Sequence, residues 1–192
     1  MATELKGSRT EQLLINSFAG ESQARNRYTF FAKVAKNEGY EQIASIFLAT
    51  AENEYQHAKL FYNHIGENMN AHVDSFYPYM LGTTEENLKF SIDGEEEEFN
   101  VLYYNGEMIA KEEGFDDVAE TFKNIRVAEH HHAQRYRKLY ENLLDGSTYK
   151  KDEIVSWVCR KCGYVYESTE APHICPCCKH PRAYFELLNE KY

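Results

Sequence analysis

Glutamate and histidine recur at helical spacing in two places along the chain. Glu54 and His57 stand three residues apart, and Glu129 and His132 repeat that spacing. Residues i and i+3 lie on one face of a helix, so each pair presents one oxygen and one nitrogen ligand to the same place. One such pair alone would most often be a solvated helix face. Two pairs in matching contexts are typical of a helical bundle that binds two metal ions.

An internal repeat relates the two pairs. The segment 35–40 (Ala-Lys-Asn-Glu-Gly-Tyr) recurs at 110–115 as Ala-Lys-Glu-Glu-Gly-Phe, and the two glycines are 114 − 39 = 75 residues apart. The same offset carries the first glutamate and histidine pair onto the second. Two similar helical hairpins are therefore expected to face each other.

The repeat also supplies a glutamate from each remaining helix. Glu21 and Glu95 both follow glycine, but they are 95 − 21 = 74 residues apart, so the second copy carries one extra residue before Tyr103. That residue indicates either a π-bulge, a feature common at functional sites, or a simple gap in a diverged repeat. Glu98 lies at i+3 from Glu95 and points inward with it.

The resulting set of four glutamates and two histidines, with Glu98 as a further inward carboxylate, favours iron or manganese. Zinc prefers fewer and softer ligands. Tyr28 and Tyr103 lie two turns after Glu21 and Glu95, where their hydroxyls could orient ligand carboxylates. In a chain with 15 tyrosines, plain core packing explains them nearly as well.

All five cysteines lie near the C-terminus. Two Cys-x-x-Cys loops, Cys159 with Cys162 and Cys175 with Cys178, have the spacing of a tetrahedral iron or zinc site. Cys177 breaks this spacing and is expected to be a spare thiol. A segment this short seldom folds without a metal or a disulfide, and an odd cysteine count argues for the metal.

The positions of capping motifs and glycines divide the rest of the chain into elements. Capping boxes begin at Ser8 and Thr83, and glycines follow the expected helix ends. The expected helices cover 8–39, 40–65, 83–114 and 115–144, and a long crossover covers 67–83. Short, long and short connections are typical of the ferritin-like four-helix bundle.

A change in composition near residue 145 predicts two domains. The expected division is an all-α ferritin-like bundle over 1–147, a linker over 148–155 and a small β/loop metal module over 156–192. The net charge of −10 opposes binding to nucleic acid and to membrane surfaces. Neither a signal peptide nor an apolar run of roughly 18 residues is present, so we expect a cytoplasmic protein.

These motifs together resemble the rubrerythrin family over essentially the whole chain. The resemblance begins with the stretch 7–28 and continues through the two Glu-x-x-His motifs, Gly-Glu-x-x-Glu at 94–98, and a rubredoxin-like tail with Cys-x-x-Cys-Gly-Tyr and Cys-Pro-x-Cys. It implies two non-haem irons in a carboxylate-bridged site and one iron bound by the four cysteines. The di-iron ligands that it implies are Glu21, Glu54, His57, Glu95, Glu98, Glu129 and His132.

The resemblance also implies a function and partners. We expect a peroxidase that reduces hydrogen peroxide to water in oxidative-stress defence. Electrons would come from an NAD(P)H-dependent reductase or from rubredoxin and would pass through the four-cysteine iron. One di-iron ion would exchange Glu98 for His57 between the oxidised and reduced states. The assembly would be a head-to-tail homodimer or a higher even oligomer, with electrons crossing between subunits.

Two rival functions share part of this pattern. An iron-storage or ferroxidase bundle would have the same helices and carboxylates, but storage needs no tethered one-electron centre. A manganese catalase with a zinc ribbon as its tail would have the same ligand spacing. Metal analysis together with a visible spectrum distinguishes the second rival, because ferric iron in four cysteines is red and zinc is colourless.

Overall fold

The start of the first helix shows how local sequence defines the bundle. In a computed structural model of the chain, the Ser8 side chain accepts a hydrogen bond from Glu11 N at 3.0 Å, whereas the Glu11 carboxylate accepts from Gly7 N, so one half of the predicted capping box is formed. The helix ends before Gly39, whose φ of 87° lies in the left-handed region that glycine adopts without strain. The structure describes residues 4–66 and 70–190, so the expectations for 67–69 and 191–192 lie outside the described residues.

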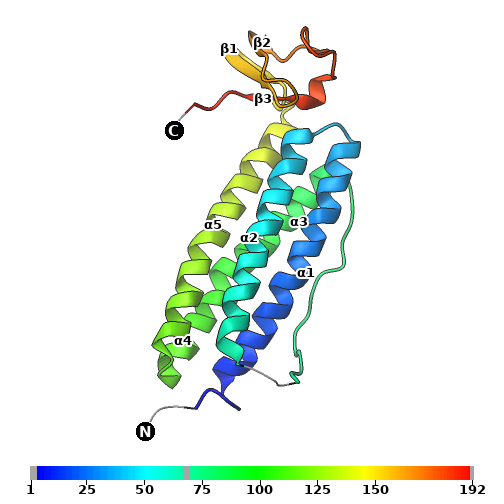
Figure 1. Ribbon diagram of the computed structural model, residues 1–192. Helices are drawn as coiled ribbons and strands as arrows, with labels where there is room; N and C mark the ends of the chain where they lie inside the picture. Colours follow the sequence, from blue (N-terminus) through cyan, green and yellow to red (C-terminus); the bar gives the residue numbers. More distant parts are fainter. Residues whose placement is uncertain (1–3, 67–69, 191–192) are drawn as a thin grey trace.

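The four expected helices are present and form a ferritin-like bundle (Figure 1). The elements are α1 (Arg9–Asn37), α2 (Glu41–Ile65), α3 (Thr84–Glu97), η1 (Glu98–Leu102), α4 (Tyr103–Glu113) and α5 (Asp116–Leu144). The elements α3, η1 and α4 follow one another without a break and correspond to the single third helix that the sequence predicts. The crossover returns along α1, where Asn16 Nδ2 donates to the Asp74 carbonyl at 2.8 Å. None of the helices in the described part of the chain is long and apolar enough to cross a bilayer.

The extra residue of the second repeat forms a π-helical turn, so the first of the two interpretations is confirmed. Within η1 the chain is wound more widely, and the Tyr103 backbone N–H bonds to the carbonyl of Glu98, five residues earlier. This turn brings Tyr103 back into register with Tyr28 of the first repeat. Glu98, the surplus inward carboxylate, is the first residue of the turn.

Two aromatic clusters fill the bundle and leave a polar layer between them. One is built around Phe31, Phe47 and Tyr136, and the other around Phe61 and Phe122. Tyr28 belongs to the first cluster and Tyr103 to the second. The glutamate and histidine pairs stand between these apolar layers, where water has little access.

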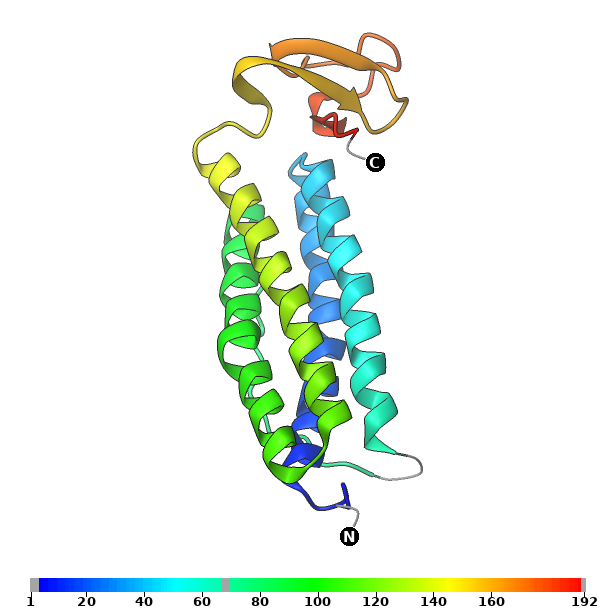
Figure 2. The same ribbon diagram turned by 90° about the vertical axis from the view of Figure 1, so that its left-hand side faces the viewer.

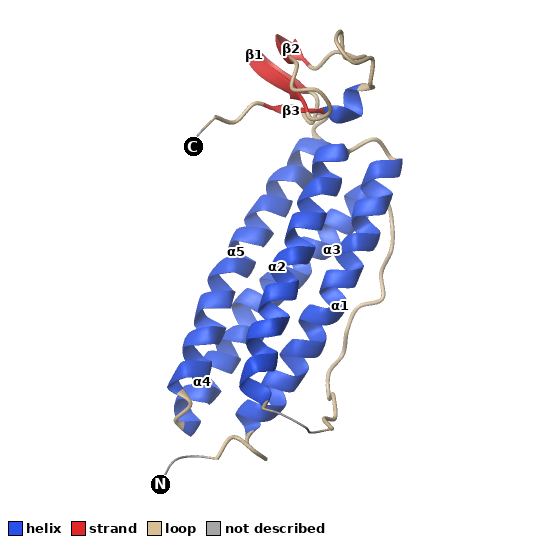
Figure 3. Cartoon of the chain, viewed as in Figure 1, coloured by secondary structure: helices blue, strands red, loops and turns tan. Residues whose placement is uncertain are grey.

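Within residues 4–66 and 70–190, the strands are confined to the C-terminal module, which covers one end of the bundle (Figures 2 and 3). It contains β1 (Lys150–Cys159), β2 (Val165–Glu170), η2 (Arg182–Tyr184) and β3 (Phe185–Leu187), with antiparallel strand order β2-β1-β3. Trp157 and Phe185 are fully buried in its core. Because Lys150 pairs with Glu170, the first strand begins inside the segment 148–155 that was expected to be a linker. Its charged residues suggested a linker, yet such residues also occur in a strand that faces solvent.

The module rests on the turn between α1 and α2. The Tyr149 hydroxyl donates to the Gly39 carbonyl at 2.7 Å, and the Tyr149 ring stacks on Tyr40 with 6.3 Å between centroids. This contact lies at the end of the bundle where α1 and α2 are joined, away from the middle of the bundle. No motif in the sequence predicted this contact between the module and the bundle.

The two helical hairpins are joined by two glutamates. Each glutamate belongs to one hairpin and caps a helix of the other. Glu113, at the end of α4, accepts hydrogen bonds from Thr10 N at 2.9 Å, Thr10 Oγ1 at 2.6 Å and Arg9 Nε at 3.0 Å. Its repeat counterpart Glu38 accepts a bond from Thr84 N at 2.9 Å. Each carboxylate thereby satisfies N–H groups in the first turn of a helix from elsewhere in the chain.

Replacing Glu113 with glutamine is expected to lower the free energy of unfolding by about 1 kcal/mol, because a charged cap of α1 is lost. Hydrogen bonds from Thr10 and Arg9 lower the pKa of Glu113 from 4.5 to about 2. Its stabilisation is therefore present above pH 4.5 and is lost as the pH falls towards 2. Urea unfolding of both proteins at several pH values measures this difference.

Glu112→Gln is the matched control, because Glu112 is 67% exposed and makes only a surface ion pair with Arg9 at 3.1 Å. Its effect should stay within about 0.5 kcal/mol. Equal losses in the two variants, or a Glu113→Gln effect that does not shrink in acid, would contradict the capping role.

Candidate metal centres

Two groups of ligand-type side chains meet in the polar layer of the bundle. Within each group the candidate ligand atoms lie within 4.8 Å of one another, and every member is buried. The first group is Glu21, Glu54, His57 and Glu129, and the second is Glu54, Glu95, Glu129 and His132. Glu54 and Glu129 belong to both groups, so they are the carboxylates that could bridge two ions.

Four different helices bring these side chains together. Helix α1 carries Glu21, α2 carries the first glutamate and histidine pair, α3 carries Glu95, and α5 carries the second pair. Nδ1 of His57 and Nδ1 of His132 each lie 2.9 Å from an oxygen of Glu129. Nδ1 of His132 also lies 3.3 Å from Glu95 Oε2. Both histidines thus direct the same ring nitrogen at the shared carboxylates.

The two tyrosines hold ligand-type carboxylates of the opposite hairpin. Tyr28 on α1 donates its hydroxyl hydrogen to Glu95, and Tyr103 on α4 donates to Glu21. Both rings are also buried in the aromatic clusters. Each ring therefore packs in the core, and each hydroxyl also donates a hydrogen bond to one of the candidate ligand carboxylates.

Carboxylate oxygens of the site are buried without a hydrogen-bond partner among the described residues. These atoms include Oε2 of Glu21 and Oε1 of Glu54. Buried oxygens of this kind are rare in proteins unless a water molecule or an ion satisfies them. The donor set, rich in carboxylate with imidazole, fits two hard or borderline cations.

The electrostatics of the metal-free site point in the same direction. Burial and neighbouring carboxylates raise the pKa of Glu21 and of Glu54 well above 4.5. Burial would also raise the pKa of Glu129, but hydrogen bonds with His132 and His57 lower it to about 2. Protons thus compensate part of the buried negative charge that cations would otherwise neutralise.

Glu98 lies beside these groups and belongs to neither of them. Its side chain is half-buried on the π-helical turn. Burial, followed by the charges of Glu21 and Glu95, raises the pKa of Glu98 well above its ordinary value. The charges of the site therefore act on Glu98, although it is not a member of either group. His57, by contrast, is a member of the first group.

Removing the metal should make stability strongly dependent on pH. In the metal-free protein, burial lowers the pKa of His57 and of His132, but bonds to Glu129 outweigh it and raise both to about 9. The two protonated histidines therefore stabilise the folded state fully below pH 6.5, and this contribution is lost as the pH rises through 9. The melting temperature of chelator-treated protein should fall between pH 6.5 and 9.5, whereas that of metal-loaded protein should change little. A metal-free melting temperature that is constant or rises over this range would contradict this charge pattern.

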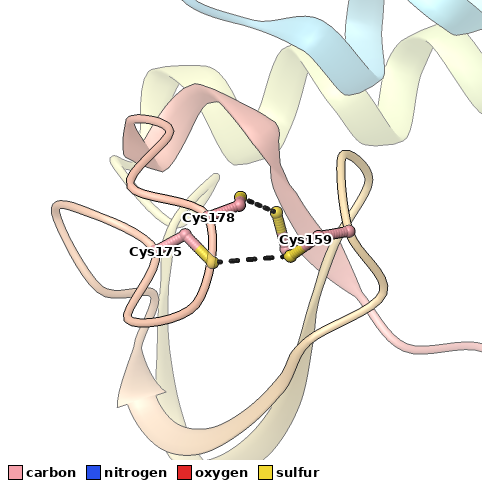
Figure 4. A group of neighbouring side chains, drawn as sticks. Cys159, Cys175 and Cys178 are labelled. Atoms are coloured by element: carbon pink, nitrogen blue, oxygen red, sulfur yellow. Dashed lines mark hydrogen bonds between the residues drawn. The ribbon is translucent and has the colours of Figure 1, made fainter.

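The four cysteines of the tail converge in the same way (Figure 4). Cys159 and Cys178 have their sulfurs 3.7 Å apart, and the sulfurs of Cys162 and Cys175 are 3.8 Å apart. Four bonds of about 2.3 Å in a tetrahedron give edges of about 3.8 Å, whereas a disulfide bond is about 2.05 Å long. The arrangement fits one tetrahedral metal ion. Cys177 is exposed and lies outside the group.

One contact of the site was not predicted. Nε2 of His132 lies 3.2 Å from Oδ1 of Asn53 on α2. Asn53 is an exposed polar residue on a helix, a pattern that carries no functional signal in the sequence. Only the packing of α2 against α5 shows that it reaches a site residue.

The fold and the two sites define a class of protein, a ferritin-like bundle with a carboxylate and histidine two-metal site and a tethered four-cysteine module. The rubrerythrin family model matches residues 12–140, and the model of the rubrerythrin rubredoxin-like domain matches 157–186. The chain belongs to the rubrerythrin family. The expected resemblance and fold class are confirmed, and the residues of a di-iron site and of a four-cysteine iron site are both in place.

Relatives match the chain over nearly its whole length. It is 47% identical to rubrerythrin of Porphyromonas gingivalis, covering 100% of this chain and 96% of the relative, and 46% identical to rubrerythrin-1 of Clostridium acetobutylicum, covering 98% of each. A solved mixed-valence nigerythrin superposes with a TM-score of 0.63 at 32% identity, covering 98% and 91%. A bacterioferritin of Desulfovibrio desulfuricans has a TM-score of 0.65 at 19% identity over 72% of this chain and 82% of its own, which shows the shared fold alone.

Proposed function

We propose that this protein is a non-haem di-iron peroxidase that reduces hydrogen peroxide to two molecules of water. The observation that carries the proposal is the presence, in one chain, of a buried two-metal ligand set and a separate four-thiolate site. The reaction consumes two electrons and two protons per peroxide. Two ferrous ions would supply one electron each, and the four-cysteine iron would return electrons singly.

The chain's own residues would set the conditions for this chemistry. The proposed ligands are the seven residues named above, with Glu54 and Glu129 bridging. Tyr28 and Tyr103 hold Glu95 and Glu21 in place through their hydroxyls. The aromatic clusters above and below exclude bulk water, which strengthens the interaction between the carboxylates and the cations.

Nigerythrin has been solved in a fully reduced, all-ferrous state, which supports iron as the metal of this family. The likeness to bacterioferritin leaves iron storage as a rival, but storage requires no one-electron site on a tail.

The remaining proposals are an NAD(P)H-dependent reductase or rubredoxin as electron donor, a cytoplasmic location, a homodimer or higher even oligomer, and domain limits of 1–147 and 156–192.

The deciding experiment is anaerobic reduction of the iron-loaded protein, followed by one equivalent of hydrogen peroxide. One equivalent removes two of the three electrons that a fully reduced chain holds, so we expect partial reoxidation after the first equivalent and complete reoxidation of the di-iron site and the red four-cysteine centre after a second. The control is a Glu54→Ala/Glu129→Ala variant, whose cysteine centre should stay reduced on the same timescale. Reduced centres that persist in the unmodified protein would rule out the peroxidase.

A prediction about ligand exchange follows from the surplus carboxylate. His57 is a member of the first group and Glu98 is not, and burial together with the charges of Glu21 and Glu95 raises the pKa of Glu98, which supports the proposal that the two alternate at one ion. Replacing His57 with alanine should leave the oxidised site largely intact and should disturb the reduced one. Crystal structures of both oxidation states would test this, and identical ligation in the two states would show that no exchange occurs.

A further inference from the structure

The two histidines of the bundle site differ in what their outer ring nitrogens contact. Nε2 of His132 lies 3.2 Å from Oδ1 of Asn53, which stands next to Glu54 on α2. Nε2 of His57 makes no hydrogen bond to any residue in the described segments. The two rings are otherwise alike, because both direct Nδ1 at Glu129 and both are buried.

The internal repeat explains this difference by a single residue. The 75-residue offset that relates His57 to His132 relates Asn53 to Ala128, since 128 − 53 = 75. Asn53 on α2 contacts His132 on α5. By the same repeat relation, a residue at position 128 on α5 would contact His57 on α2. A methyl group there has no oxygen to accept a hydrogen bond.

The chemistry of imidazole makes this contact important for a metal ligand. A ring nitrogen that binds a metal has given up its hydrogen, so in the neutral ring the other nitrogen carries one. An acceptor for that N–H fixes both the tautomer and the ring orientation, and loss of such an acceptor typically lowers metal affinity about 10- to 100-fold. The carbonyl oxygen of an asparagine side chain is an acceptor of the required kind.

We propose that Asn53 is a positioning residue that anchors His132 through its outer ring nitrogen, and that Ala128 leaves His57 without such an acceptor. This inference rests on the proposed two-metal centre and adds a residue that supports one of its two histidines. Asn53 is exposed, so it can be replaced without opening a cavity in the core. The competing explanation is that Asn53 only joins α2 to α5.

The first test is manganese binding by the full-length protein, followed through the electron paramagnetic resonance signal of free Mn(II). Manganese suits carboxylate and imidazole and is a poor match for thiolates, so the cysteine site interferes little. Asn53→Ala should weaken one of the two manganese sites about 10- to 100-fold. Asn53→Asp keeps an acceptor oxygen and should restore binding to within about threefold of the unmodified protein. Gln56→Ala, an exposed polar residue on the same helix, is the matched control and should bind normally.

A purely structural role makes a different prediction. It would lower the melting temperature of metal-free Asn53→Ala and leave both manganese affinities unchanged, and that result would overturn the proposal. If the unmodified protein bound fewer than two manganese ions, the two-metal centre itself would be wrong. If the unmodified protein bound two manganese ions and Asn53→Ala bound both with unchanged affinity, the two-metal centre would stand and only the role proposed for Asn53 would be wrong.

The second test supplies the missing acceptor. Ala128→Asn should give His57 a partner and tighten the other manganese site about tenfold, within the range that such contacts contribute. In crystals of the iron-loaded variant, His57 should keep the same ring position in oxidised and reduced protein. Unchanged affinity and an unchanged His57 position relative to the parent would show that Ala128 does not determine its freedom.

Discussion

Replacing Cys178 with serine is expected to abolish the red colour of the four-cysteine iron and more than nine-tenths of the turnover with a donor that enters through the tail. The Cys178 sulfur lies 3.7 Å from that of Cys159, at the edge length of a tetrahedron of about 2.3 Å metal bonds. Serine replaces a soft thiolate with a hard, weakly acidic hydroxyl. The site would then lack one of its four ligands.

Cys177→Ser provides the matched control, because the two cysteines are adjacent in the chain. Cys177 is exposed and is not a member of the sulfur group. Its replacement should leave the spectrum and turnover unchanged. Measurement consists of the visible spectrum, iron content and peroxidase rate of each variant. Equal loss of colour in the two variants would mean that the ligand register is wrong.

The second large effect is expected on the peroxidase activity of mixed dimers, in which the two subunits carry different substitutions. Along α2, the 57 − 40 = 17 residues from Tyr40 to His57 span about 26 Å, because each helical residue rises about 1.5 Å. Tyr40 is the residue on which the tail rests through Tyr149. The tail of a chain therefore lies far from the bundle site of that chain (Figure 2). A partner packed antiparallel would bring its own bundle site close to this tail.

We therefore expect complementation in a mixed dimer. One chain carries Cys159→Ser and Cys162→Ser, and the other carries Glu54→Ala and Glu129→Ala. Each homodimer should be nearly inactive with a donor that enters through the tail. The mixed dimer, isolated through two different affinity tags, should regain up to half of the activity of the unmodified dimer, because one tail and one bundle site remain connected across the subunits.

The inverse arrangement is the control. A dimer of one unmodified chain and one chain that carries all four substitutions should be nearly inactive if electrons cross between subunits, since neither crossing route is complete. The same dimer should retain half of the activity if electrons stay within a chain. Mixed dimers of the first kind that hold their metals and stay inactive would also exclude the crossing route.

Much of the fold was predictable because its signals are local. The capping box at Ser8 and the glycine at position 39 mark the ends of α1 within two residues, since a cap and a left-handed glycine act on the nearest turn. The one-residue mismatch between the repeats predicted the π-helical turn as one of two possibilities. The start of β1 was missed, because the pairing of Lys150 with Glu170 joins residues twenty positions apart in the chain.

By itself, the sequence determined which residues could bind metals. The Glu-x-x-His spacing places two ligands on one helix face, and the Cys-x-x-Cys spacing places two thiolates in one loop, and both follow from backbone geometry over a few residues. Only the tertiary structure decided which groups these ligands form and what supports them. That Glu54 and Glu129 are shared, that Tyr28 holds Glu95, and that Asn53 reaches His132 all depend on how separate helices pack. Such contacts of the site, including that of Tyr103 with Glu21, join residues up to 82 positions apart in the chain, where no local spacing rule applies.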